Sequence, residues 1–191
     1  MTQWNIQNVL TYPVSERWLD EAQARSKEGG LNEHTDVKDD IKGQITGHLT
    51  EFAFGRALKE RGIPFEKINP PPIWDYDFLV GSARIDTKGK FRRVDIRPHY
   101  TCDAPEYQQN AIDFYVFGSW NSVGKRIQLV AAASQKRFKE HAEVIPKGEI
   151  FDGRPLTSNR LVAHYKDFHP FKDYLEWLDL YTYQIAFGEK T

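Results

Sequence analysis

The chain has 191 residues, of which 40% are hydrophobic and 28% charged, which suits one globular domain with a core of its own. Its net charge of -1 excludes a protein whose whole surface attracts nucleic acid, so any such binding needs a local basic patch. Apolar runs such as residues 129–133 are far shorter than the roughly 18 residues of a membrane helix, and the lone Cys102 cannot form an internal disulfide. We therefore expect a single domain over residues 1–191 that does not enter the membrane and resides in the reducing cytoplasm.

The N-terminal third predicts two amphipathic helices. The first covers residues 15–27, is capped by Ser15 and stops at Gly29 and Gly30. The second starts after Asp39 or Asp40 as N-cap and runs to residue 58, before Gly62 and Pro64. One face of this second helix carries an apolar stripe that consists of Ile41, Ile45, Leu49, Phe52 and Ala53.

From residue 76 onwards the pattern is typical of strands. Residues 76–80 and 83–88 flank a Gly81-Ser82 turn and predict a β-hairpin, whose second arm residues 91–96 can extend. The runs 111–117 and 126–133 predict two further strands of a central sheet. Ser134 caps a short helix through residue 140, residues 160–165 suit an edge strand, and Pro170 opens a last helix. This order predicts an α/β sandwich with a central mixed sheet flanked by helices.

Two acids and a lysine stand in the arrangement D-x8-D-x-K across the predicted hairpin, at Asp77, Asp86 and Lys88. Side chains two apart on a strand point to the same face, so Asp86 and Lys88 project together, and pairing of the hairpin brings Asp77 beside Asp86. Two carboxylates beside a lysine suit Mg²⁺ or Mn²⁺, which commonly take few protein ligands and fill the remaining positions with water and phosphate. Such a site favours phosphodiester hydrolysis, with the lysine orienting a water or offsetting transition-state charge.

Glu51 lies on the second predicted helix, away from the centre of the apolar stripe. Gln44, His48 and Gly55 are near it at helical spacing, so a polar line runs along a helix that otherwise faces the core. An ordinary solvent-exposed glutamate is the alternative interpretation.

Taken together, these residues resemble the PD-(D/E)XK nuclease superfamily, in which a helix with an acidic residue precedes a hairpin bearing an Asp and then (Asp/Glu)-x-Lys. GHLTEFAFGRAL resembles that helix, YDFLV the strand with the Asp, RIDTKGK the (D/E)xK strand and AIDFYVFG the next core strand, over about residues 41–133. Tyr76 stands where the superfamily has its proline. Asp75, two residues before Asp77, is an alternative to it.

The resemblance implies a restriction-endonuclease-like fold and a nuclease that hydrolyses DNA with Mg²⁺ or Mn²⁺. The implied catalytic residues are Glu51, Asp77, Asp86 and Lys88, and the implied metal ligands are Glu51, Asp77, Asp86 and the Thr87 carbonyl. His48 is a further candidate beside Glu51. Gln108 or Gln109 could take the place of a glutamine that many such nucleases carry after the lysine strand, although a surface-loop residue is the alternative.

A basic segment follows the predicted lysine strand. Its side chains could hold flanking phosphates without reading sequence, or could simply form a solvated charge run: Lys90, Arg92, Arg93, Arg97 and His99.

The rival hypothesis is a catalytically inactive protein that keeps the nuclease fold and binds nucleic acid or a protein partner. A phage accessory protein that inhibits a host factor is a third reading, and a phage setting would also suit a small nuclease, by analogy alone. DNA versus RNA, and endonuclease versus exonuclease, stay open. A homodimer would supply two sites for two strands.

Overall fold

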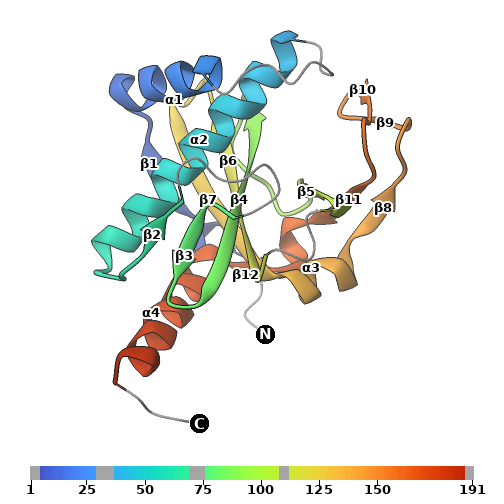
Figure 1. Ribbon diagram of the computed structural model, residues 1–191. Coiled ribbons are helices and arrows are strands. Elements are labelled where there is room, and N and C mark those ends of the chain that lie inside the picture. Colours follow the sequence, from blue (N-terminus) through green and yellow to red (C-terminus); the bar gives the residue numbers. More distant parts are fainter. Residues whose placement is uncertain (1–4, 29–36, 69–75, 108–111, 188–191) are drawn as a thin grey trace.

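The computed structural model describes residues 5–28, 37–68, 76–107 and 112–187, and within them a seven-stranded mixed sheet forms the centre of the molecule (Figure 1). Its strand order is β1-β7-β6-β4-β3-β2, with the short β12 also paired to β7. The strands are β1 (Leu10–Pro13), β2 (Glu66–Lys67), β3 (Phe78–Val80), β4 (Ala83–Arg92), β6 (Phe114–Asn121), β7 (Arg126–Ser134) and β12 (His169–Pro170). All described pairs are antiparallel except β4 with β6, which is parallel.

Helices cover both faces of this sheet. One face is covered by α1 (Glu16–Glu28), α2 (Val37–Glu60) and α4 (Phe171–Phe187), and the core there includes Leu49, Phe54, Ile85 and Phe171. The other face packs against α3 (Gln135–His141) and a second sheet of order β5-β11-β8, built from β5 (Thr101–Pro105), β11 (Arg160–His164) and β8 (Glu143–Ile145). A small hairpin of β9 (Ile150–Phe151) and β10 (Arg154–Pro155) extends from that side, and the 3₁₀ turns Ile6–Asn8 and Tyr165–Asp167 complete the described elements. The predicted α/β class with a mixed sheet flanked by helices is confirmed.

The predicted hairpin is present as β3 and β4. Phe78 pairs with Ile85, and Gly81 makes the turn at a φ of +60°, a conformation that glycine adopts without steric cost. β3 pairs only with residues 83–85 of β4, whereas β6 pairs along residues 85–92. Among the described strands, none pairs with β4 on the side away from β6 beyond residue 85. The chain therefore has an open strand edge where the (D/E)xK segment lies.

Two glycines let α2 lie very close to this sheet. A Cβ placed on Gly89 of β4 would stand 2.6 Å from the backbone carbonyl oxygen of Thr46, and one on Gly118 of β6 would stand 2.5 Å from Thr50 Oγ1. Because real Cβ atoms do not approach so closely, larger residues at these positions would push α2 away. The two glycines thus set the short distance between α2 and β4, and with it the position of Glu51 on α2 relative to β4.

Several predicted elements are confirmed at their ends. Ser15 Oγ accepts a hydrogen bond from the Trp18 amide at 3.2 Å, and Ser134 Oγ accepts one from the Arg137 amide at 3.2 Å, so both serines act as helix caps. The last helix begins directly after Pro170. None of the described helices combines the length and apolar character needed to cross a membrane.

Three predictions about elements are wrong. β4 ends at Arg92, so residues 93–96 do not extend the second arm of the hairpin. α2 begins at Val37, so Asp39 and Asp40 lie inside its first turn and neither is the N-cap. β11 is not an edge strand, since it pairs with β5 on one side and β8 on the other. Both of its partners escaped prediction because they are short and pair with residues far away in the sequence.

Candidate active site

Asp77 lies where β3 meets the open edge of β4. Continuing the hairpin register by one residue from the Phe78–Ile85 pair places it opposite Asp86, as predicted. Its Oδ2 accepts hydrogen bonds from the Thr87 amide at 2.8 Å and from Thr87 Oγ1 at 2.6 Å. These two bonds fix the carboxylate against the edge of β4.

Asp86 and Lys88 project together from the face of β4 opposite α2, because Thr87 between them points the other way. Their neighbours in register on β6 are Tyr115 and Phe117, which belong to the core on that face. Asp86 is only 3% exposed, and its Oδ2 lies 2.8 Å from Lys88 Nζ. Asp86 is therefore buried, whereas Lys88 is partly buried, with its side chain 23% exposed.

Electrostatics keep Lys88 charged. Burial lowers the pKa of its amine, but the ion pair with Asp86 and the charge of Asp77 outweigh this and raise the pKa above its ordinary value. Burial raises the pKa of Asp86, and the charge of Glu51 adds to the rise while Lys88 opposes it. Lys88 can thus supply a fixed positive charge at neutral pH.

Glu51 on α2 is held by two partners. Its Oε1 lies 3.1 Å from His48 Nδ1 and its Oε2 lies 2.9 Å from Lys67 Nζ on β2. Burial raises the pKa of Glu51, but the hydrogen bond with His48 and the charge of Lys67 outweigh it, so the pKa is lowered. Glu51 is therefore an ionised carboxylate with both oxygens engaged.

The three acids lie near enough to influence one another. The pKa of Asp77 is raised to about 7, first by burial and then by the charges of Asp86 and Glu51, against the opposing effects of the Thr87 hydrogen bonds and Lys88. The cluster has three carboxylates and two lysines, Lys67 and Lys88, so with all three acids ionised it carries one negative charge more than the lysines neutralise. A site of this kind gains from a bound cation.

The donor set fits a hard divalent cation with few protein ligands. Among the described residues, no group of three or more His, Cys, Asp or Glu side chains is arranged to hold a metal ion. Two carboxylates remain, Asp77 and Asp86, and Mg²⁺ is commonly held by one or two, with water and phosphate filling the other positions. The Thr87 amide points to Asp77, and the amide and carbonyl of one strand residue project to the same side, so the Thr87 carbonyl also lies on this edge.

A cleft of about 580 Å³ follows the open edge of β4. Its walls come from the N-terminal half of α2, from β4 itself, and from the second sheet with the β9–β10 hairpin, which lie to the right of β4 in Figure 1. Thr87 and Lys88 belong to this lining. Six cations and two aspartates line the cleft: Lys42, Lys88, Lys90, Arg92, Arg154, Arg160, Asp103 and Asp152.

The predicted phosphate-binding residues divide into two groups. Lys90 and Arg92 line the cleft, whereas Arg93, Arg97 and His99 are exposed and do not. Lys90 already has two acidic partners, because its Nζ lies 3.0 Å from Asp103 and 2.9 Å from Asp152.

Arg92 donates to the Thr101 carbonyl at 3.1 Å and stacks over Tyr100 at 4.2 Å. Of the other candidates, His48 hydrogen-bonds Glu51. Asp75, Gln108 and Gln109 lie outside the described residues.

Sequence reasoning missed four cations that belong to the site. Lys67 is the partner of Glu51, and Lys42, Arg154 and Arg160 line the cleft. None of them follows a motif, and Arg154 and Arg160 lie more than 60 residues after Lys88 in the chain. Arg154 and Arg160 join the site only because β11 and the β9–β10 hairpin fold beside β4.

No protein-family model, curated protein or solved structure matches this chain.

Proposed function

We propose that the protein is a metal-dependent nuclease that hydrolyses phosphodiester bonds of DNA, with Asp77, Asp86 and Lys88 at the reacting centre. The observation that carries the proposal is a pair of carboxylates, Asp86 buried and Asp77 partly buried, with a charged lysine at an open strand edge, bordering a cleft rich in cations. Asp77 and Asp86, with the Thr87 carbonyl, would hold Mg²⁺ or Mn²⁺. The ion would supply positive charge to the scissile phosphate and lower the pKa of a bound water.

Lys88 would contact the substrate directly. Asp86 keeps it protonated and fixes its direction, so its ammonium can orient the attacking water or stabilise the charge that develops on the phosphate oxygens. Thr87 has a positioning role, because its amide and hydroxyl fix the carboxylate of Asp77. Glu51 would act on the cluster through its charge, while His48 and Lys67 hold both of its oxygens.

The cleft would guide the nucleic-acid backbone toward this centre. Lys42 of α2 lines it together with Arg154 of β10 and Arg160 of β11, so a strand lying along β4 would meet cations from both the helix and the second sheet. Phosphate contacts of this type give affinity without sequence readout. Replacing Arg160 with Gln should therefore weaken binding to all sequences alike and reduce the slope of log affinity against log salt by about one.

The test is digestion of plasmid and oligonucleotide DNA with Mg²⁺ or Mn²⁺. Wild type should cut, and Lys88→Ala or Asp86→Asn should cut more slowly by about 100- to 1,000-fold, as when one charge-stabilising donor is removed. Lys139→Gln, on the exposed surface of α3, is the matched control and should cut like wild type. Thermal unfolding of each variant separates loss of chemistry from loss of fold. Folded variants that cut as fast as wild type would refute the proposal.

One alternative is favoured by a specific observation: the described residues lack a group of three metal-binding side chains, and both oxygens of Glu51 are engaged. A nuclease-fold protein that binds nucleic acid or a protein without cutting would have this arrangement. It predicts binding that EDTA does not change and no cleavage of DNA or RNA. A homodimer in the cytoplasm is our expectation for the nuclease, and sedimentation with and without DNA measures its assembly state.

A further inference from the structure

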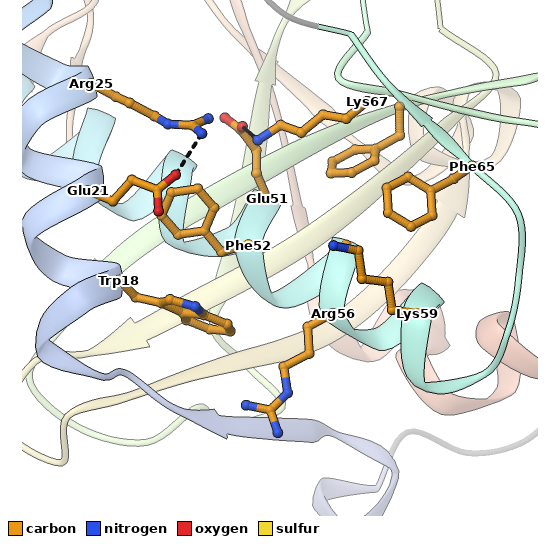
Figure 2. Close-up of a pocket in the computed structure, with 11 residues that line it drawn as sticks. Trp18, Glu21, Arg25, Glu51, Phe52, Arg56, Lys59, Phe65 and Lys67 are labelled. Carbon is orange, nitrogen blue, oxygen red and sulfur yellow. Dashed lines mark hydrogen bonds and ion pairs between the residues drawn. The ribbon is translucent and has the colours of Figure 1, made fainter.

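A second pocket, of about 540 Å³, lies across α2 between α1 and β2 (Figure 2). We call it the α1–β2 pocket. Its volume is within the range of about 300–1,000 Å³ that is usual for small-ligand sites. Four of the residues that line it are aromatic: Trp18, Phe52, Phe65 and Phe78.

The aromatic rings stand on two sides of the pocket. Trp18 and Phe52 form one side with ring centroids 5.9 Å apart, and Phe65 and Phe78 form the other with centroids 5.7 Å apart. Trp18, Phe52 and Phe65 are only partly buried, so ring surface is left for a ligand. A flat aromatic group is the ligand that such walls accommodate best.

The charges that line the pocket favour an anion. Four cations and two carboxylates contribute to it, and both carboxylates are engaged, Glu21 with Arg25 at 2.7 Å and Glu51 with Lys67 at 2.9 Å. Lys59 has no ion pair with another described residue. Figure 2 shows its amine directed between Phe52 and Phe65.

We propose that the α1–β2 pocket binds a nucleotide, with the base against the aromatic rings and the phosphate at Lys59. Phe78 belongs to the lining; it follows Asp77 in the chain and pairs with Ile85, the neighbour of Asp86, so the bound nucleotide lies beside the candidate active site. When a nucleic-acid substrate is bound, the group that fills the α1–β2 pocket is then an unpaired base close to the scissile phosphate. This last step rests on the proposed nuclease function, whereas binding of the nucleotide does not.

The binding test uses adenosine 5′-monophosphate and adenosine as probes, titrated into the full chain in EDTA and followed by calorimetry. EDTA removes divalent ions, so binding through a metal at Asp77 and Asp86 does not contribute. Lys59→Gln should weaken binding of the monophosphate about tenfold and leave adenosine unchanged, because only the phosphate contact is lost. Phe65→Leu keeps an apolar side chain but removes the ring, and should weaken both probes about tenfold. Lys139→Gln is the control.

The proposal is overturned if wild type shows no saturable binding of the monophosphate, or if both variants bind it as wild type does. The link to the substrate is tested by cleavage of a blunt duplex and of the same duplex with a single-stranded overhang. Lys59→Gln should slow cleavage of the overhang substrate only. If wild type binds the nucleotide but cuts no DNA, the nucleotide-binding proposal is supported and the proposed nuclease function is refuted.

Discussion

The close contact between α2 and the sheet can be tested by adding one methyl group. In Gly89→Ala the new Cβ would lie 2.6 Å from the Thr46 carbonyl oxygen and 2.6 Å from Thr50 Oγ1, where ordinary contacts are 3.4–4 Å. The carbonyl belongs to the helix backbone and cannot rotate away. The substitution must therefore lift α2 from β4.

The expected loss of folding stability is large for the addition of a single methyl group. Overpacking a core costs about 1–3 kcal/mol, and we expect the upper end because a backbone atom is struck. The Ala side chain also restricts the unfolded chain, which returns only about 0.4–1 kcal/mol. The net loss is then about 2–2.6 kcal/mol, and at about 2–4 °C per kcal/mol for a chain of this size the melting temperature should fall by roughly 4–10 °C.

Urea and thermal unfolding measure this loss of stability. Two further substitutions, Gly118→Ala and Thr50→Ala, test whether the contact with α2 causes it. In Gly118→Ala the nearest atoms all belong to the Thr50 side chain, with Oγ1 at 2.5 Å and Cγ2 at 2.6 Å, so Thr50→Ala should remove most of the loss. The same change should rescue Gly89→Ala only in part, because the Thr46 carbonyl remains.

Gly47→Ala in the same helix meets nothing within 4 Å and should stabilise the protein by about 1 kcal/mol. If Gly89→Ala unfolds like wild type, or if Thr50→Ala rescues both glycine variants fully, the close approach of α2 to β4 is wrong.

Two other predictions concern titration and reactivity. The pKa of Asp77 is about 7 in the folded protein, and its ordinary value is 3.8. The folded state therefore loses stability as the pH rises from the lower to the higher of these values. In urea unfolding, Asp77→Asn should be more stable than wild type at pH 8 but not at pH 4. Asp113→Asn is the control of opposite sign, because hydrogen bonds from Arg84 lower the pKa of Asp113. This variant should be less stable than wild type at pH 8, and the difference should shrink in acid. If either variant changed the stability equally at both pH values, the reasoning would be contradicted. Cys102 is 2% exposed, and burial raises the pKa of its thiol, so a thiol reagent should react only after denaturation; rapid reaction of the native protein would show that the second sheet opens.

The sequence predicts the elements that are coded locally. The β3–β4 hairpin, with Asp77 near Asp86 and with Asp86 and Lys88 on one face, follows from a period of two and a turn glycine. α1, α3 and α4 follow from their caps and apolar spacing. In each case the residues that decide the structure lie within a few positions of one another.

The rest depends on contacts between distant residues. β5 pairs with β11 so that Thr101 lies opposite His164, and no local pattern announces a pair so far apart. Lys67 and Glu51, and Arg160 and Lys88, are likewise separated in the chain and belong to no common motif, so the sequence does not predict that they lie near each other. The charge of Lys90 was visible in the sequence, but its neutralisation by Asp103 and Asp152 required the fold.

The short length of β3 has a consequence for how the protein behaves in a crowded solution. A strand that lacks a neighbour on one side is a template on which a second molecule can add its own strand and start an aggregate. In β4 the next amide beyond the β3 ladder on that side is that of Thr87, and the carboxylate of Asp77 already occupies it. An approaching strand would have to displace a bound anion, so the residue proposed to serve chemistry also protects the protein from self-association.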